Sequence, residues 1–340
     1  MIVYRELSSL ERDLGIPAKT LYAVSNRLGN HYRKTRIPKR GGGERMLTVP
    51  DEILKKIQRR IADVLLSSMP VSRYAIAYRP GGSTLKNAAA HVGQPVVLKL
   101  DILHFFDSVR YSDVKEKAFP GEIYSEQNRV LLAMLCYCQN ALPQGAPSSP
   151  VITNILMRDF DERLGAWCHS RGIAYTRYCD DMTFSGCLDP KEVIAFVRRE
   201  LKAMGFLLNG QKTRIQRAGQ RQTVTGIVVN VQPGVPREYL RKLRQELYYC
   251  EKYGIRAHLT RTGQEITEEA YAARLLGQVS YALQISPENE EMRRARAWLL
   301  KQEALKNGRA EMPSAGNDGG VRTEGKPENR GPAGGGLLHQ

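Results

Sequence analysis

Residues 176–186 read TRYCDDMTFSG and place Asp180 and Asp181 side by side between two short stretches that alternate in polarity. Alternation of this kind is typical of strands, so the stretch predicts a β-hairpin with the two aspartates at its turn. Adjacent carboxylates repel each other, and a turn exposes both, which favours a cation between them. An isolated pair of aspartates is more often an ordinary surface turn. The choice between a surface turn and a metal site therefore depends on other parts of the chain.

A third aspartate, Asp101, follows the apolar strand VVLKL far upstream of the hairpin. Mg²⁺ takes oxygen ligands, usually one or two carboxylates together with waters and substrate phosphates. If the fold brings Asp101 to the hairpin, the three carboxylates would form a site for two metal ions. Such a site can activate a hydroxyl and stabilise a leaving oxygen, which is the chemistry of phosphoryl transfer.

The charge of the chain favours a polyanionic partner. Its 340 residues include 51 Lys and Arg against 35 Asp and Glu, a formal charge of +16. Nucleic acid or an anionic membrane would fit, and the alternative is a basic surface that binds nothing specifically. No stretch approaches the roughly 18 consecutive apolar residues of a spanning helix, and the N-terminus lacks the apolar core of a signal peptide. We therefore expect a cytoplasmic protein that does not contact the membrane.

The cysteines predict neither zinc binding nor disulfides. All 6 lie outside CxxC pairs and outside Cys/His sets with zinc-ligand spacing. We expect reduced thiols, several of them in the core, which agrees with a cytosolic protein.

The order of the predicted elements indicates an α+β protein. Helical and strand patterns alternate without βαβ regularity, which favours a mixed sheet flanked by helices and followed by a basic helical module. From about residue 307, Gly and Pro accumulate and apolar residues thin out, so we expect a disordered tail. The expected elements are helices within the first thirty residues, a hairpin around 36–50, a helix at 50–69, a strand at 95–101, helices at 125–138 and 151–172, the hairpin at 173–186, a helix at 190–206, a single short strand at 222–230 and helices from 236.

The tetrapeptide YCDD (178–181) is similar to the YxDD signature of reverse transcriptases, and further motifs follow in that family's order. They are the fingers hairpin IPKRGGGERMLTVP (37–50), the first catalytic-Asp motif LKLDILHFFDSV (98–109), the nucleotide-binding loop and helix LPQGAPSSPVITNILM (142–157) and GFLLNGQKTRI (205–215) after the catalytic hairpin. The resemblance spans roughly 36–230. It implies a right-hand polymerase with N-terminal helices and fingers (1–95), a palm with a fingers insertion at about 112–150 (96–232), a helical RNA-binding thumb (233–306) and the tail (307–340).

Two shorter features resemble retron reverse transcriptases. NAAAH (87–91) matches an NAxxH pattern before the first catalytic strand, and VTG (224–226) stands near the end of the palm. The resemblance implies an enzyme that binds a structured noncoding RNA of the msr–msd type and primes from the 2′-OH of an internal guanosine. It would copy part of that RNA into DNA, leaving 2′,5′-branched multicopy single-stranded DNA. Such systems usually act in antiphage defence with a separate effector protein.

The resemblance also implies roles for individual residues. Asp101, Asp180 and Asp181 would ligate two Mg²⁺ ions, with the backbone carbonyl of Ile102 as a helper, and Lys212 would protonate or stabilise the leaving pyrophosphate. For the incoming deoxynucleoside triphosphate, the implied contacts are Lys39 and Arg45 at the phosphates, Phe106 as a steric gate against a ribose 2′-OH, and Gln144 in the pocket. The bland alternatives are a solvated basic hairpin for Lys39 and Arg45, a core phenylalanine for Phe106 and an exposed lysine for Lys212.

The predicted RNA contacts divide into two groups. Asn87 and His91 would contact RNA or shape the strand before Asp101, and Val224, Thr225 and Gly226 belong to the second retron feature. In the thumb, the tyrosines would stack on bases or pack the helix against its neighbour; they are Tyr248, Tyr249 and Tyr253.

Two rival functions remain open from sequence. One is another reverse transcriptase, either intron-derived or diversity-generating. The other is an RNA-binding scaffold that holds RNA and an effector, with polymerisation incidental. Loss of the phenotype on mutating both hairpin aspartates would separate an enzyme from a scaffold.

Overall fold

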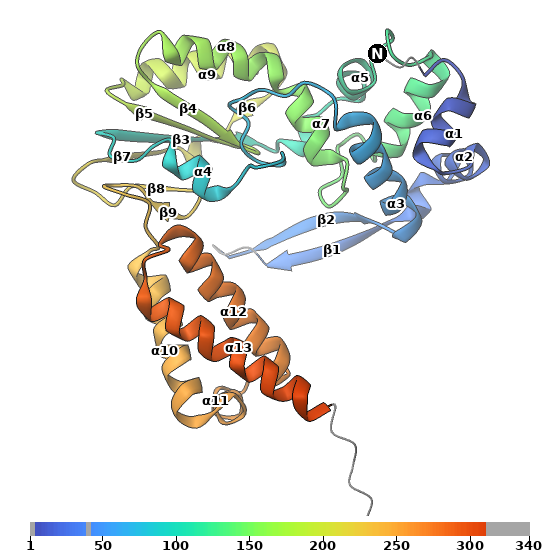
Figure 1. The fold of residues 1–340 in the computed structure, drawn as a ribbon. Helices are drawn as coiled ribbons and strands as arrows, with labels where there is room; N and C mark the ends of the chain where they lie inside the picture. Colours follow the sequence, from blue (N-terminus) through green and yellow to red (C-terminus); the bar gives the residue numbers. More distant parts are fainter. Residues whose placement is uncertain (1–3, 39–41, 311–340) are drawn as a thin grey trace, which may run out of the picture.

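A five-stranded antiparallel sheet is the largest sheet in the described part of the chain and lies on the left in Figure 1. This computed structural model describes residues 4–38 and 42–310, with side chains described as far as residue 302. The strand order is β4–β5–β3–β6, and β7 also pairs with β3. The strands of this sheet are β3 (Val96–Leu103), β4 (Ala174–Tyr178), β5 (Asp181–Gly186), β6 (Leu207–Leu208) and β7 (Arg214–Arg217).

Both flanks of β3 are occupied, which makes it the central strand. β5 pairs along one side, while β7 and then β6 pair with successive stretches of the other side. β3 is an almost continuous apolar run, as expected of a strand buried on both faces. It continues to Leu103, so Asp101 lies inside the strand and not at its end.

Helices cover the sheet, and the N-terminal helices pack together next to it. In Figure 1, α8 and α9 lie together over one face of the sheet. One apolar core runs from the sheet through these helices to the N-terminal ones. The helices are α1 (Leu7–Leu14), α2 (Ala18–Asn26), α3 (Glu52–Arg60), α4 (Thr84–Ala89), α5 (Tyr111–Asp113), α6 (Glu126–Cys136), α7 (Ser149–Leu156), α8 (Arg158–His169) and α9 (Pro190–Ala203). Short 3-10 segments are Leu28–His31, Phe106–Ser108 and Gly210–Lys212, and π-helical turns are Ile61–Leu66 and Val114–Ala118.

The hairpin predicted around residues 36–50 is confirmed. β1 (Tyr32–Pro38) pairs antiparallel with β2 (Glu44–Pro50) in unbroken register. The first residues of its tip, 39–41, lie outside the described part of the chain, and Lys39 is among them.

A helical module follows the sheet and has a core of its own. It consists of α10 (Arg237–Tyr253), α11 (Ile255–Thr262), α12 (Glu268–Ile285) and α13 (Glu290–Ala310). Its core includes Val97 of β3 and Val224, so the module packs against the sheet through the central strand and the 222–230 segment. Figure 1 shows it extending away from the sheet. α13 continues to Ala310, past residue 307, where the tail was expected to begin; residues 311–340 lie outside the described part.

The prediction of one strand at 222–230 is wrong. The segment forms a small hairpin from β8 (Thr223–Val224) and β9 (Ile227–Val228). Thr225 and Gly226 make the two-residue turn, with φ of 46° and 84°. Such turns need positive φ at both central residues, which glycine adopts freely and threonine rarely does, so the sequence pattern concealed the turn.

No helix in residues 4–38 and 42–310 is long and apolar enough to cross a membrane. The cysteines are all free thiols, and all except Cys187 are buried.

Candidate active site

The sheet brings the three predicted carboxylates together. Asp101 on β3 lies directly opposite Asp181 on β5 in the antiparallel register. The backbone N–H of Ile102 donates to the carbonyl oxygen of Asp180 at 3.1 Å, which holds the turn against the central strand. Like charges directly across a strand pair destabilise a sheet, so this register is unfavourable unless something positive compensates it.

Asp101 is the buried one of the three aspartates, and a positive group and a polar group contact its carboxylate. Asp101 is only 4% exposed. Lys212 Nζ lies 2.7 Å from its Oδ2, and Asn209 Nδ2 donates to its Oδ1 at 3.1 Å. Both partners come from the segment after β6, whose strand pairing with Ile102 and Leu103 sets their position.

At the two hairpin aspartates, nearby positive groups offset burial and charge repulsion less completely. Burial, and then repulsion by Asp101, raise the pKa of Asp180. Desolvation and repulsion by Asp180 and Asp101 raise the pKa of Asp181 to about 6, although its side chain still reaches solvent. A divalent cation would relieve this repulsion.

The donor set fits Mg²⁺ better than a softer metal, because it consists of carboxylate oxygens. Within the described ranges, no group of three or more His, Cys, Asp or Glu side chains is arranged to hold a metal ion by itself. A site of this kind would therefore need substrate phosphates and waters as further ligands, as Mg²⁺ sites commonly do.

Lys212 is held at the site and is not a free surface lysine. Its side chain is 55% exposed, yet its ammonium contacts Asp101. The hydrogen bond to Asp101 raises the Lys212 pKa. The ammonium is therefore charged at neutral pH and stands where phosphate oxygens would approach the carboxylates.

The predicted nucleotide-contacting residues converge on the fingers hairpin. The N–H of Thr48 on β2 donates to the carbonyl of Gln144 at 3.0 Å, and the N–H of Leu142 donates to the carbonyl of Phe106 at 3.1 Å. At Gly145, with φ of 121°, an added Cβ would lie 3.2 Å from the Thr48 carbonyl oxygen, so the loop approaches β2 closely. Phe106 and Gln144 are both partly exposed.

The core phenylalanine at this point of the chain is Phe105, and Phe106 is not fully buried. Phe105 is 3% exposed and belongs to the core, whereas Phe106 packs on it edge-on with ring centroids 5.5 Å apart. Arg45 is exposed on β2 opposite Ile37, a position from which it can reach a polyanion.

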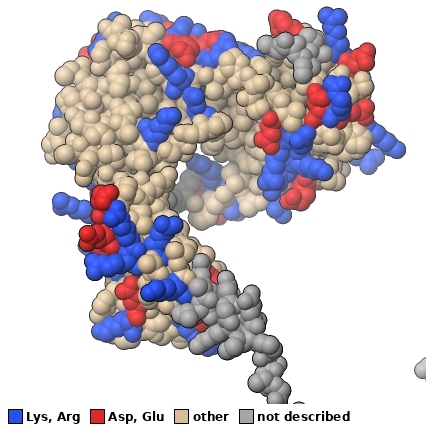
Figure 2. Space-filling model, viewed as in Figure 1, with Lys and Arg blue, Asp and Glu red and all other residues tan. Residues whose placement is uncertain are grey.

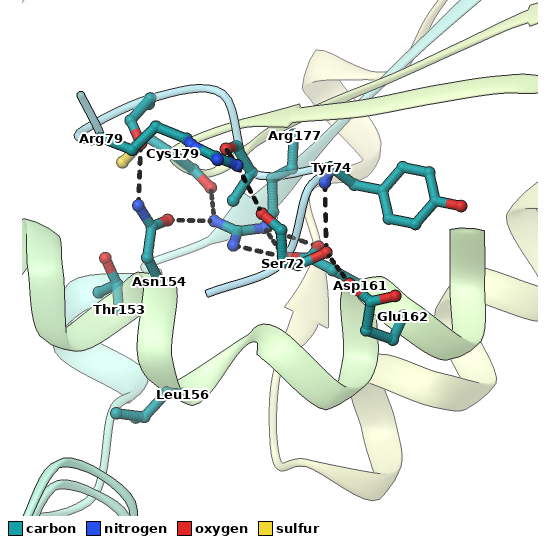
Figure 3. A network of polar contacts seen from close by, with 12 residues as sticks. Ser72, Tyr74, Arg79, Thr153, Asn154, Leu156, Asp161, Glu162, Arg177 and Cys179 are labelled. Carbon is teal, nitrogen blue, oxygen red and sulfur yellow. Dashed lines mark hydrogen bonds and ion pairs between the residues drawn. The ribbon is translucent and has the colours of Figure 1, made fainter. Parts of the chain in front are cut away.

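A buried ion-pair network, drawn in Figure 3, contacts the hairpin turn at Cys179. Arg177 and Asp161 are both fully buried, and Arg177 Nη2 lies 2.6 Å from Asp161 Oδ2. Arg177 Nη1 also donates to Asn154 Oδ1 at 3.3 Å and to the carbonyl of Cys179 at 2.9 Å. The hydroxyl of Tyr175 donates to Asp161 at 2.7 Å. The network ties the turn, where Cys179 has φ of 63°, to α7 and α8.

Sequence reasoning missed this network. The available signal was Arg177 itself, a cation that the alternation of this strand places on the same face as Ile173 and Tyr175. A buried charge has to be paired, so the position implied an unseen carboxylate. Sequence reasoning also missed Tyr78, which the fold brings to the same turn.

The first retron feature is structural in this protein. His91 is fully buried, and both ring nitrogens lie 2.7 Å from hydroxyls, Nδ1 from Ser185 and Nε2 from Thr176. Burial lowers the His91 pKa to about 4, so the ring is neutral and bridges β4 and β5. Asn87 is 1% exposed, and its side-chain amide has no hydrogen-bond partner among the described residues.

The prediction that Asn87 and His91 contact RNA directly is therefore corrected, because neither offers surface to a ligand. Their positions agree with the alternative that they shape the strands around Asp101. Val224 is fully buried as well, whereas Gly226 is exposed at its turn. Thr225 Oγ1 donates to the carbonyl of Thr84 at 3.0 Å, so the second retron feature is tied to α4, the helix that carries Asn87.

The helical module presents aromatic and basic side chains together. Tyr248 and Tyr253 on α10 are 53% and 54% exposed, and Lys252 lies over both rings. The Tyr249 ring is partly buried and carries Arg261 at 4.7 Å from its centroid. Figure 2 shows Lys and Arg, interspersed with acidic residues, on the face of this module seen there. The exposed basic residues of its first helix include Arg237, Arg241, Lys242 and Arg244.

Comparison with known proteins agrees with the geometry. The profile of the family described as "Reverse transcriptase (RNA-dependent DNA polymerase)" matches residues 37–241. The retron Mx65 and Mx162 reverse transcriptases of Myxococcus xanthus are each 36% identical, over 77% and 65% of this chain and 63% and 53% of their own. The retron Ec86 reverse transcriptase of Escherichia coli is 30% identical over 74% of this chain and 80% of its own. The chain thus spans less than two thirds of the two Myxococcus relatives.

Proposed function

The chain belongs to the retron-type reverse transcriptases, and on that premise we propose that it is the RNA-directed DNA polymerase of a retron. Its substrate is a cognate structured RNA of the msr–msd type, which it copies into 2′,5′-branched multicopy single-stranded DNA. The observation that carries this proposal is the register that sets Asp101 opposite Asp181 beneath a YCDD turn. A sheet would not keep this repulsive pair without a use for it.

In this proposal Asp101, Asp180 and Asp181 hold two Mg²⁺ ions, with the Ile102 carbonyl as a further oxygen. The bound metal supplies positive charge at the attacking hydroxyl and at the leaving pyrophosphate. The protein itself supplies position: the pairing of β3 with β5 keeps the carboxylates at one level, and the Arg177 network holds the turn from below.

In this proposal Lys212 acts on the leaving pyrophosphate. Its charged ammonium, held by Asp101, is close enough to the carboxylates to meet the pyrophosphate as it departs. There it donates a proton or stabilises the developing charge.

The incoming deoxynucleoside triphosphate lies between the fingers hairpin and the 142–148 loop. Arg45 and Lys39 contact its phosphates, and Gln144 lines its pocket. The ring of Phe106 fills the space that a ribose 2′-OH would need. The contacts of Thr48 with Gln144 and of Leu142 with Phe106 support this arrangement, because they bring these elements together.

The helical module acts as the thumb. Basic residues on α10 and α11 follow the phosphates of an RNA stem or an RNA–DNA hybrid, while Tyr248 and Tyr249 stack on bases. Thr225 and Gly226 reach RNA from the exposed β8–β9 turn. We assign residues 1–95 to N-terminal helices and fingers, 96–232 to the palm and 233–306 to the thumb.

The biological setting follows from the family. Priming from the 2′-OH of an internal guanosine, a separate effector protein and a role in antiphage defence in the cytoplasm are all part of the proposal. An intron-derived or diversity-generating reverse transcriptase would share the site but make unbranched DNA, and an RNA-binding scaffold would make none.

The test is made on nucleic acid that copurifies with the protein from cells carrying its native gene neighbourhood. After RNase treatment, a 2′,5′-debranching enzyme should shift a discrete DNA band on a denaturing gel. RNA without DNA would favour the scaffold, and DNA that debranching leaves unchanged would favour another reverse-transcriptase lineage.

A further inference from the structure

A segment outside the recognised motifs runs beside the catalytic hairpin. Ala75 forms a parallel bridge with Arg177, and two backbone hydrogen bonds of 2.8 Å flank it. In one, Ile76 N–H donates to the Arg177 carbonyl, and in the other Arg177 N–H donates to the Tyr74 carbonyl. Three residues beyond this bridge, the Tyr78 side chain interacts with Cys179 and Asp180.

The buried network holds this segment and the catalytic turn at the same time. Asn154 Nδ2 donates to the carbonyl of Ala77 at 2.8 Å, while Arg177 joins Asn154 to the carbonyl of Cys179. The residues concerned stand immediately before Tyr78 and before Asp180. One set of buried side chains therefore fixes Tyr78 relative to a catalytic aspartate.

Tyr78 is strained and exposed, which a purely structural tyrosine has no reason to be. Its φ is 57°, in the left-handed region that non-glycine residues rarely adopt. Its side chain is 50% exposed, although burying an aromatic ring is strongly favourable. Strain of this kind persists where the surroundings enforce it and clusters at functional sites.

The hydroxyl of Tyr78 faces the turn. Burial of the phenol group, together with the Cys179 thiol and the Asp180 charge, raises the Tyr78 pKa, so the phenol stays neutral. The exposed face of the ring remains beside the carboxylates. Exposed aromatic faces next to a basic nucleic-acid surface are typical platforms for sugars and bases. The other tyrosines exposed in the described ranges, Tyr248 and Tyr253, lie on α10, away from this turn.

We propose that Tyr78 contacts the primer strand, packing its ring against the terminal nucleotide whose hydroxyl the carboxylates act upon. The proposal rests on the proposed polymerase function and names a residue for one part of it. The primer end has to reach Asp180 and Asp181 in every cycle of polymerisation. A ring fixed to the same buried network keeps that end in register with them.

The kinetic test uses the full chain with a DNA primer annealed to an RNA template. Tyr78→Ala should raise KM for the primer–template by roughly tenfold, as expected for the loss of one stacking contact, and leave KM for the nucleotide unchanged. Tyr78→Phe should restore most of the affinity, because it keeps the ring. Ile53→Ala, which removes a 53% exposed apolar side chain from α3, is the control. Equal primer–template KM in Tyr78→Ala and wild type would overturn the proposal.

A cross-linking test needs neither catalysis nor a stable alanine variant. A primer ending in iododeoxyuridine should cross-link to Tyr78 on irradiation of the wild-type complex, and peptide mapping should locate the adduct. A cross-link to other residues without Tyr78 would overturn the proposal even if DNA synthesis is normal. A wild-type protein that cross-links at Tyr78 but extends no primer would support it while contradicting the polymerase assignment.

Discussion

Arg177 donates a hydrogen bond to the carbonyl oxygen of Cys179 at 2.9 Å, and this contact connects a fully buried ion pair to the residue before the first hairpin aspartate. Asp161 is therefore part of the support of the catalytic turn, although it lies in α8. The same guanidinium reaches Asn154, which holds the segment that carries Tyr78. Precise placement of the site depends on one buried charge pair.

Asp161→Asn should destabilise the protein strongly. The change leaves the Arg177 charge buried without a counter-ion, a defect that typically costs about 3–5 kcal/mol. Urea unfolding followed by circular dichroism would measure it. Asp159→Asn, two residues earlier on α8, removes an exposed carboxylate that pairs with the half-buried Arg158, and it should change stability by less than about 1 kcal/mol. Equal midpoints for the two variants would contradict the role of the network.

The double variant Asp180→Asn with Asp181→Asn should make no DNA and still bind RNA. Neutral amides keep the shape of the turn but provide no charge for metal ions, whereas RNA contacts lie largely elsewhere. Primer extension and filter binding would measure the two properties separately. Asp107→Asn, an exposed carboxylate near the site, is the control and should polymerise normally. DNA synthesis by the double variant would refute the metal assignment.

Lys212→Ala should lower kcat by about a hundredfold while changing KM for the nucleotide little, because the lysine acts on the leaving group. Single-turnover kinetics would isolate this step. Lys202→Ala on α9, an exposed lysine, should behave as wild type. A rise in KM at unchanged kcat would instead assign Lys212 to substrate binding.

Polymerisation should fall as the pH drops through about 6. The folded-state pKa of Asp181 is raised to about 6, so its carboxylate is protonated below that pH and no longer attracts a cation. The free energy of unfolding of the metal-free protein depends on pH in the opposite direction. Protonation of Asp181 removes its repulsion with Asp180 and Asp101, which stabilises the fold at low pH. This contribution is lost as the pH rises through about 6. Magnesium titrations at several pH values would check this, since excess Mg²⁺ should shift the activity midpoint downward. A midpoint that does not respond to Mg²⁺ would exclude competition between metal and protons.

Phe106→Ala should allow ribonucleotides into the site. Removing the ring opens space for a 2′-OH, and discrimination by a pocket wall typically amounts to roughly 10–200-fold. Incorporation of matched deoxy- and ribonucleotides opposite the same template base would measure the change. An unaltered preference would indicate that another side chain acts as the gate.

The sequence predicted those elements of the site that have a recognisable pattern within a short stretch of residues. The YCDD hairpin, the strand bearing Asp101 and the fingers hairpin each have a clear period and turn signal, and all three are confirmed. The family's motif order joined them across long separations, which periodicity alone could not do.

The missed features depend on contacts between distant segments. Tyr78 reaches the turn only because residues 75–78 run alongside β4, and no pattern within that segment announces the pairing. The Thr225–Gly226 turn was hidden because threonine seldom adopts positive φ. For His91 the sequence left both an RNA contact and a structural role open, because its burial between two hydroxyls becomes visible only in three dimensions.

The most direct test of the central claim is the debranching experiment on copurified nucleic acid. The account predicts a discrete, RNase-resistant DNA species whose mobility changes after treatment with a 2′,5′-debranching enzyme. It further predicts that this species is absent when Asp180 and Asp181 are replaced by asparagine. Copurified RNA with no DNA from the wild-type protein would contradict the account.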